Sequence, residues 1–380
     1  MSSIHIVGAG PAGLMAATHC VARGEKVHMY DHKKAAGRKF LVAGHGGFNL
    51  THSEDLATFL TRYDHPEIRK IVQEFDAGKT IGWLKSIGVD TYVGSSGKVF
   101  PVKGIKPIHV LENWLNALRQ SGVEFHFSHR LIDFNQEYLL FDSEGVQQNV
   151  EYEHAVFAFG GKSWSKTGSD AVWTELFSEK EIGVSLLEPS NSGLEMSEPY
   201  PDLEGRPLKN ICLYTEEAER SGELVFTHYG LEGSPVYFMN RFIRQKSFPQ
   251  QVFLDLKPNL SVVEIETRLT GSKKIADGLR SMKLDGIKLE LLRKTSKEVF
   301  TNPSLLAEKI KKYPLTVSGF RPLDEVISTY GGVLWEELNE DLSLKKFPKI
   351  KCAGEMLNWD APTGGYLLQA CFASGYKAGG

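Results

Sequence analysis

Cysteine is scarce in this sequence, with four residues among 380. The cysteines lie far apart and form no Cys-x-x-Cys pair; they are Cys20, Cys212, Cys352 and Cys371. This spacing argues against a disulfide framework, a zinc ribbon and a dithiol redox centre. A chain of this kind suits a reducing compartment, so we expect a cytoplasmic protein.

A large net charge is also missing, because 44 Lys and Arg residues nearly balance 47 Asp and Glu residues. Without a strong overall field, we expect neither nucleic acid nor a membrane as a partner. The uncharged stretch 6–22 lacks the basic leader of a signal segment, and it contains Gly-Ala-Gly-Pro-Ala-Gly. We therefore expect a strand, a turn and a helix there instead of a membrane span.

Motifs of two large groups of enzymes are absent. No Gly-x-Ser-x-Gly elbow occurs, which argues against a serine hydrolase. We expect no metal site, because these histidines show no His-x-x-x-His or His-Glu pattern: His19, His28, His45, His52 and His109. Neither hydrolysis nor metal-dependent chemistry is favoured.

The start of the chain instead shows a β-α-β pattern. Residues 3–7 read as a buried strand, residues 11–23 have helical spacing, and residues 26–30 read as a second strand. The first strand and the helix are joined by Gly8-Ala9-Gly10-Pro11-Ala12-Gly13, and the second strand ends at Asp31. This order of elements is typical of a dinucleotide-binding fold.

Each residue of that fingerprint has a physical task. Gly8 permits the tight turn, Gly10 lets a diphosphate approach the backbone, and Gly13 lets the helix pack closely on the strand. The helix N-terminus offers amide groups and a partial positive charge to the diphosphate. Asp31 is expected to accept hydrogen bonds from the adenosine ribose. An ordinary glycine-rich turn is the alternative interpretation.

The end of the chain distinguishes FAD from NAD. Residues 351–355 read as a strand that leads to Gly354 and Glu355, and residues 361–366 lead to a helical stretch at 367–379. A flavin needs such a second set of backbone contacts for its ribityl chain and ring. The alternative is that Gly364 and Gly365 only cap a core helix. We expect this helix to continue past the last residue.

The middle of the chain predicts a second domain. Between residues 186 and 315 the strands become short and then give way to a charged helical stretch. We predict an α/β protein with a discontinuous Rossmann-like domain at 1–185 and 316–380. The predicted insertion at 186–315 has a β-rich part at about 186–258 and a helical part at about 259–315.

Several segments together resemble the YhiN-like flavoprotein family, also called BaiN/RdsA-type NAD(P)/FAD-dependent oxidoreductases. The glycine-rich segment 37–51 is similar to the family signature G-R-K-x-x-x-S-G-x-G-R-C-N-x-T. Similar segments follow in order at 159–161, 168–170, 226–230, 329–333 and 354–369. The resemblance implies FAD, a Rossmann-like FAD domain, and an insertion made of a β-barrel-like part and a helical part.

The sequence departs from the family pattern at several positions. Gly47 and Phe48 stand where many relatives have Arg-Cys, Asn358 stands in place of an Asp, and Glu232 stands in place of a Ser. These departures indicate a divergent subgroup. The bile-acid reductions attributed to some members of the family are therefore not transferred to this chain.

These patterns predict a set of site residues. Arg38 and Lys39 suit phosphate or flavin carbonyl oxygens better than base catalysis. His45, in the glycine-rich loop, is the first candidate for a catalytic proton donor, followed by His228 and Tyr366. The residues expected to contact FAD are Gly8, Gly10, Pro11, Ala12, Gly13, Asp31, His32, Arg38, Lys39, Gly44, Gly46, Asn49, Leu131, Gly160, Gly161, Gly354, Glu355, Gly364, Gly365, Tyr366 and Leu367.

The predicted function is an FAD-dependent oxidoreductase that acts on an unidentified small molecule. No second nucleotide fingerprint follows a strand, so an NAD(P)H electron donor is expected to bind only transiently, in the substrate cleft. The alternative electron sources are the substrate itself and a protein donor. One alternative is an RNA-modifying flavoprotein with a basic patch in residues 272–312. Another is a flavin-binding redox sensor without turnover.

Overall fold

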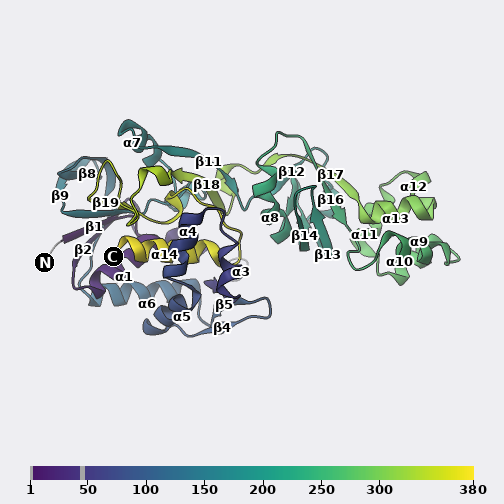
Figure 1. Cartoon of the computed structure of the whole chain (residues 1–380), viewed down its shortest axis with the longest axis horizontal. Coiled ribbons are helices and arrows are strands. Elements are labelled where there is room, and N and C mark those ends of the chain that lie inside the picture. Colours follow the sequence, from purple (N-terminus) through teal and green to yellow (C-terminus); the bar gives the residue numbers. More distant parts are fainter. Residues whose placement is uncertain (1–2, 43–47) are drawn as a thin grey trace. The chain divides into compact units, whose positions relative to one another are not determined.

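The computed structural model describes residues 3–42 and 48–380. The chain forms two compact units, Met1–Glu188 with Leu323–Gly380 (the dinucleotide unit) and Pro189–Pro322 (the inserted unit) (Figure 1). Each unit has its own hydrophobic core. The inserted unit ends later than the predicted residue 315, because strand β17 (Tyr313–Phe320) closes its β-barrel.

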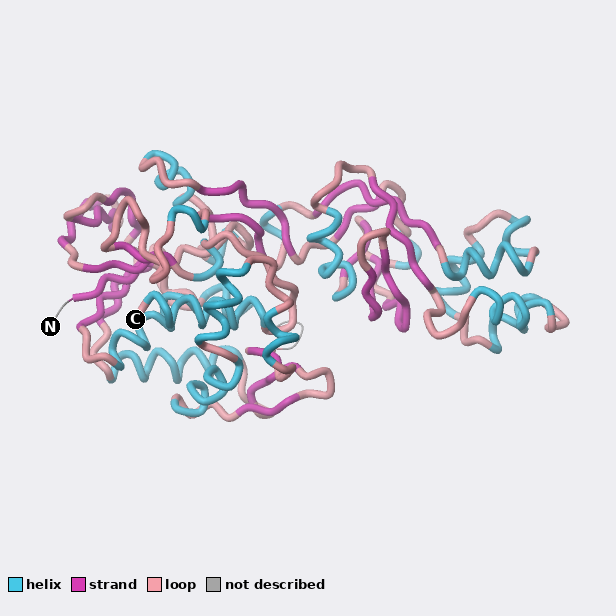
Figure 2. Tube along the Cα trace, viewed as in Figure 1, coloured by secondary structure: helices cyan, strands magenta, loops and turns pink. Residues whose placement is uncertain are grey.

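The dinucleotide unit is built on one parallel sheet with helices and two small antiparallel sheets around it (Figure 2). The parallel sheet contains β1 (Ser3–Val7), β2 (Lys26–Asp31), β6 (Glu124–Phe127), β10 (His154–Phe157) and β19 (Ile350–Cys352). One of the smaller sheets contains β3 (Thr51–His52), β4 (Thr91–Val93) and β5 (Lys98–Pro101). The other contains β7 (Arg130–Phe134), β8 (Tyr138–Ser143) and β9 (Val146–Glu151). The helices are α1 (Pro11–Ala22), α2 (Arg38–Val42), α3 (Leu56–Leu60), α4 (Pro66–Glu74), α5 (Ala77–Ser86), α6 (Pro107–Gln120), α7 (Trp173–Glu179) and α14 (Tyr366–Ala378).

A two-stranded sheet of β11 (Val184–Ser190) and β18 (Ser328–Val333) stands where the chain leaves and re-enters the dinucleotide unit. The inserted unit then combines a closed barrel with a group of helices. The other barrel strands are β12 (Leu194–Met196), β13 (Pro207–Tyr214), β14 (Glu219–Phe226), β15 (Gly230–Glu232) and β16 (Gln250–Asp255). The helices are α8 (Ser234–Ile243), α9 (Val262–Thr270), α10 (Ile275–Ser281), α11 (Gly286–Arg293), α12 (Lys297–Thr301) and α13 (Pro303–Lys311). The predicted fold class is confirmed.

The strand order of the parallel sheet determines where a ligand can bind. The order is β19-β10-β1-β2-β6, and every pair is parallel. The chain runs from β1 to β2 on one side and later returns to β10 on the other side. A crevice therefore opens at the carboxyl ends of β1 and β10, which is the usual ligand site of such sheets.

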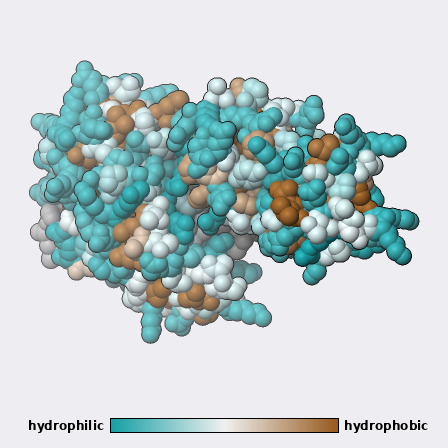
Figure 3. Space-filling model, turned by 45° about the vertical axis from the view of Figure 1, so that its right-hand side comes forward, coloured by the Kyte–Doolittle hydropathy of each residue, from teal (hydrophilic) through white to brown (hydrophobic). Residues whose placement is uncertain are grey.

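The surface gives no sign of a membrane-spanning helix. Within residues 3–42 and 48–380, no helix is both long and apolar enough to cross a bilayer. The face shown in Figure 3 is mostly hydrophilic, with hydrophobic residues in small separate groups. Apolar side chains gather instead in the two buried cores.

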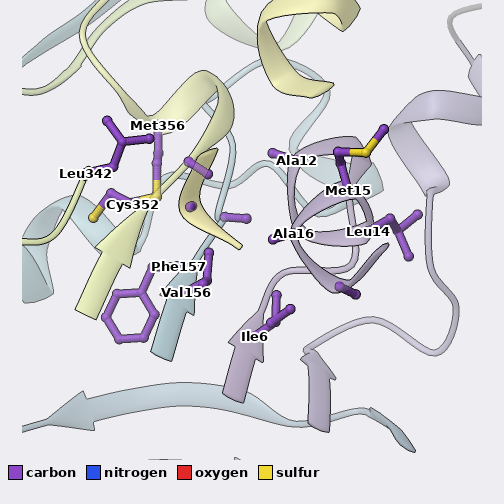
Figure 4. Close-up of a cluster of buried hydrophobic side chains, with 14 of the residues drawn as sticks. Ile6, Ala12, Leu14, Met15, Ala16, Val156, Phe157, Leu342, Cys352 and Met356 are labelled. Atoms are coloured by element: carbon purple, nitrogen blue, oxygen red, sulfur yellow. The ribbon is translucent and has the colours of Figure 1, made fainter. Parts of the chain in front are cut away.

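The first and last helices of the dinucleotide unit, α1 and α14, pack so closely that their backbones are in contact. A Cβ atom on Gly375 of α14 would lie 2.1 Å from the carbonyl oxygen of Ala12, so only glycine fits there. Helix α1 is apolar almost throughout and turns Ala12 and Ala16 towards the strands that carry Ile6 and Val156 (Figure 4). This packing holds the two ends of the chain around one core.

One local expectation differs from the structure. The glycine-rich segment 37–51 was expected to form a loop, but it contains the short helix α2 and runs into the short strand β3, which pairs with β5. Helix α14 runs to Ala378, with Gly379 as its C-cap, as the helical pattern of this segment predicts.

Candidate functional site

A cavity of about 310 Å³ opens at the crevice at the carboxyl ends of β1 and β10. Its walls come from the segments that follow β1, β2, β10 and β19, so the carboxyl ends of four parallel strands meet there. The predicted cofactor residues that line it are Gly8, Gly10, Pro11, Ala12, Asp31, His32, Arg38, Lys39, Leu131, Gly160, Gly354 and Glu355.

The three glycines of the fingerprint have different surroundings. A Cβ atom on Gly8, which has φ +108°, would lie 2.3 Å from the carbonyl oxygen of Ala158. A Cβ atom on Gly13 would lie 1.9 Å from the carbonyl oxygen of Gly8, whereas one on Gly10 would meet no atom within 4 Å. Gly8 and Gly13 are therefore required by backbone packing, while Gly10 leaves free space in the wall of the cavity.

The N-terminus of α1 is suited to bind a diphosphate. Gly10 is its N-cap, no side chain caps the first turn, and that turn carries no acidic residue. Its amide groups lack intrahelical acceptors and add to the positive end of the helix dipole. A diphosphate that enters the cavity would satisfy them, and Arg38 also lines the cavity.

Asp31, which was predicted to contact the adenosine ribose, lines the cavity together with its neighbour His32. The backbone N–H groups of Ala9 and Lys33 donate to the two carboxylate oxygens of Asp31, each over 2.8 Å. These bonds fix the carboxylate and leave lone pairs for ribose hydroxyls. Burial lowers the pKa of His32, and its Nε2 is buried without a hydrogen bond within the described residues. A buried polar atom of this kind in a cavity wall fits a bound ligand.

A charged network joins the two distant halves of the dinucleotide unit. Lys39 Nζ donates to Glu355 Oε2 over 2.7 Å and to Ser163 Oγ over 2.6 Å. The backbone N–H of Thr329 donates to the other oxygen of Glu355 over 3.1 Å. Lys39 and Glu355 both face the cavity, so the pair holds its far wall together.

Other predicted residues lie outside the lining of this cavity. Gly365 is the N-cap of α14 with φ +102°, and a Cβ atom there would lie 2.6 Å from the backbone of Thr51. Asn49 has a buried Nδ2 atom without a hydrogen bond in the described part of the chain. The remaining predicted residues outside the lining are Gly13, Gly161, Gly364, Tyr366 and Leu367. Gly44, His45 and Gly46 fall outside the described residues, and their roles remain predictions.

The structure describes two of the three catalytic candidates, each within its own unit. His228 belongs to the inserted unit, where its side chain is 70% exposed and lies 3.5 Å from Glu204. Tyr366 belongs to the dinucleotide unit and is buried, with its hydroxyl donating to Glu54 over 2.6 Å. The Tyr366 ring packs on Phe59 and stacks on His52. These contacts describe a structural residue better than a proton donor.

We expect Tyr366→Phe to lower the free energy of unfolding by about 1 kcal/mol and to leave FAD binding intact, because only the bond to Glu54 is lost. Burial alone would raise the pKa of Glu54, but bonds from Arg62 and Tyr366 outweigh it and lower the pKa. The lost stabilisation therefore exists above the ordinary pKa of 4.5 and fades as the pH falls through the lowered value. Denaturant unfolding of the unsubstituted chain and of Tyr366→Phe, at pH 7 and at pH 3.5, measures this difference in the free energy of unfolding. A difference that is larger at pH 3.5 than at pH 7 contradicts the assignment.

Some cavity residues were missed by the sequence reasoning. Arg130 and Asp170 line the cavity and form an ion pair over 2.9 Å, and Asp170 also lies 3.7 Å from His32 Nε2. Asp170 stands within the family-like segment 168–170, which was the available signal. Arg130, at the start of β7, carries no local signal.

Comparison with known proteins gives the family. The model of the HI0933-like protein Rossmann domain matches residues 2–380. The chain belongs to this family. The suspected YhiN-like assignment is thereby confirmed, and the divergence seen in the sequence is a divergence within the family.

Two characterised relatives match along nearly their whole length. The chain is 25% identical over 405 residues to the 3-dehydro-bile acid delta(4,6)-reductase of Clostridium scindens, and the match covers 100% of this chain and 98% of that protein. It is 21% identical over 399 residues to the ribosomal RNA dihydrouridine synthase of Escherichia coli, and the match covers 98% of this chain and 95% of that protein.

Solved structures show the same fold. A flavocytochrome c3 fumarate reductase in its open conformation has a TM-score of 0.54 and 14% identity, and the match covers 100% of this chain and 77% of that one. The 3-ketosteroid-delta4-(5alpha)-dehydrogenase of Rhodococcus jostii RHA1 has a TM-score of 0.54 and 12% identity, with coverage of 100% and 95%. The predicted class, an FAD-dependent oxidoreductase, is confirmed by the family together with the reductase among its full-length relatives.

Proposed function

We propose that this FAD-dependent oxidoreductase reduces a carbon–carbon double bond conjugated to a carbonyl group in a small ring compound, with NAD(P)H as electron donor. The observation that carries the proposal is the reaction shared by the two full-length relatives. The name of one is a delta(4,6)-reductase of a 3-dehydro-bile acid, and the name of the other is a synthase of dihydrouridine. Both names describe the saturation of a ring double bond.

The residues of this chain suit that cofactor. The first turn of α1 would hold the diphosphate and Asp31 would hold the ribose, while the Lys39–Glu355 pair forms the far wall of the cavity. Bound FAD supplies hydride transfer, which an electron-poor carbon next to a conjugated carbonyl accepts. The protein then has to position the substrate and deliver one proton.

The state of the cysteines supports a reaction in which electrons do not pass through a dithiol. All four cysteines are free, and burial raises the pKa of Cys20 and of Cys371, each to about 12. Cys371 lines the cavity, but as a neutral thiol it is a poor nucleophile. Free thiols also support the proposal that the protein works in the cytoplasm.

A second candidate substrate is a uracil base in RNA, and one observation favours it. Residues 259–315, which include α9–α13, contain twelve Lys and Arg residues against seven Asp and Glu residues. Lys273, Lys274 and Lys283 are exposed there. A local basic surface of this kind attracts phosphate in spite of the near-neutral total charge.

The test is anaerobic reduction followed by substrate addition. The FAD-loaded chain is mixed with NADH or NADPH, and we expect one of them to bleach the visible flavin band. A steroid acid with a 3-oxo-4-ene group should then restore the band and yield the saturated product, detected by mass spectrometry. The saturated steroid acid is the control, and unmodified ribosomal RNA at low and high salt tests the second candidate.

The outcomes separate the alternatives. If only RNA restores the visible flavin band, and salt weakens this effect, the substrate is a nucleic acid and not a small molecule. A flavin that no nicotinamide reduces contradicts NAD(P)H as the donor. Reduced flavin that neither compound reoxidises under anaerobic conditions contradicts the proposed substrate class.

A further inference from the structure

One edge of the parallel sheet carries a cluster of histidines that the dinucleotide site does not use. Strands β2 and β6 pair in parallel, with His28 beside Glu124 and Tyr30 beside His126. Because side chains alternate along a strand, His28, Glu124 and His126 lie on the same face. His5 of β1 stands next to His28 on that face.

The donor atoms of three of these residues converge. His28 Nδ1 lies 3.3 Å from His126 Nε2 and 3.2 Å from Glu124 Oε2. All three donor atoms lie within 4.8 Å of one another. Zinc bonds to imidazole nitrogen and carboxylate oxygen are about 2.0–2.1 Å long, so two ligands of a tetrahedral ion lie roughly 3.3–3.4 Å apart. The two distances from His28 Nδ1 match this spacing, and the third separation, between Glu124 and His126, is at most 4.8 Å.

Neighbouring groups hold the donors in place. The ring of His5 stacks on that of His28 at 5.1 Å between centroids, and the ring of Tyr30 stacks on that of His126 at 4.6 Å. Lys26 Nζ lies 3.1 Å from Glu124 Oε1, which leaves Oε2 turned towards His28. Ligands that are oriented before the ion arrives lose less entropy on binding.

We propose that His28, Glu124 and His126 bind a divalent transition-metal ion of the zinc class at the β2–β6 edge of the sheet. Imidazole ligands favour zinc and its neighbours over magnesium and calcium. The Glu124 side chain is 49% exposed, so water has access to the fourth ligand position. The ion would link two strands whose histidines are 98 residues apart in the sequence, and the proposal is independent of the proposed reaction.

The spacing of histidines along the sequence does not predict this site. A His-x-x-x-His or His-Glu pattern lies within one segment of a chain. The three ligands come from two strands, and only the parallel register of β2 and β6 brings them together.

The test measures zinc on the FAD-loaded chain. After treatment with a chelator, the protein is dialysed against micromolar Zn²⁺ and the bound metal is quantified. We expect about one ion per chain, and at least a roughly tenfold weaker association for the His28→Gln/His126→Gln double variant. His154→Gln replaces an exposed histidine on β10 of the same sheet, and this control should bind zinc as the unsubstituted chain does.

Thermal unfolding gives a second measurement. Zn²⁺ should raise the Tm of the unsubstituted chain and of His154→Gln, but not that of the double variant, and Mg²⁺ should raise none of them. If the double variant does not fold, Glu124→Gln at the half-exposed position must weaken zinc binding about tenfold. Equal zinc binding by the unsubstituted and variant chains would overturn the proposal and leave the contact between His28 and His126 as a hydrogen bond only.

Discussion

Gly10→Val is expected to weaken FAD binding strongly and to leave the chain folded. Gly10 has φ −86° and ψ −177°, which any residue can adopt, and a Cβ atom there meets nothing within 4 Å. The free space is the cavity itself, so the valine methyl groups would occupy the place of the diphosphate. We expect FAD affinity to fall by roughly a hundredfold or more, about 3 kcal/mol, as measured by flavin fluorescence titration of the apoprotein.

Two other glycines are matched controls for this prediction. Gly82 of α5 is exposed, and a Cβ atom there also meets nothing within 4 Å, so Gly82→Val should bind FAD normally. Gly13→Ala should instead destabilise the apoprotein by roughly 1–3 kcal/mol, because its Cβ would clash with the backbone of Gly8. A Gly10→Val chain that retains normal FAD affinity would show that the diphosphate does not pass over Gly10.

Local patterns predicted the part of the site that is local in sequence. The strand, glycine turn and helix between Ser3 and Ala22 follow from periodicity and from the backbone demands of Gly8 and Gly13, which act over a few residues. Helix ends were placed within one or two residues for the same reason. The acid at the end of β2 was also found, because its distance from the glycines is fixed by the β-α-β geometry.

Contacts between distant segments could not be predicted in this way. The bond between Lys39 and Glu355 joins residues 316 positions apart, and neither residue carries a local sign of its partner. The ion pair of Arg130 and Asp170 is similar. The end of the insertion was placed too early because β17 looks like any strand, and only pairing with β12 and β16 shows that it closes the barrel.

The second large effect is expected on stability, when the ion pair of Lys39 and Glu355 is broken. Lys39→Met should lower the free energy of unfolding of the apoprotein by about 2–3 kcal/mol, measured by urea denaturation. The Glu355 side chain is only 14% exposed, so removal of the ammonium leaves a largely buried carboxylate without its cation. Lys39→Met/Glu355→Gln should recover much of the loss, because the neutral amide can still accept from the N–H of Thr329.

An exposed ion pair with the same N–O distance is the control that separates the effect of burial from the effect of the contact itself. Lys70 and Glu67 also lie 2.7 Å apart, but their side chains are 67% and 40% exposed. Lys70→Met should therefore lower the free energy of unfolding far less than Lys39→Met does, since water and salt screen the lost interaction. Equal losses for Lys39→Met and Lys70→Met would mean that Glu355 is hydrated through the cavity. The cavity wall would then owe its stability to backbone packing alone, as at Gly8 and Gly13.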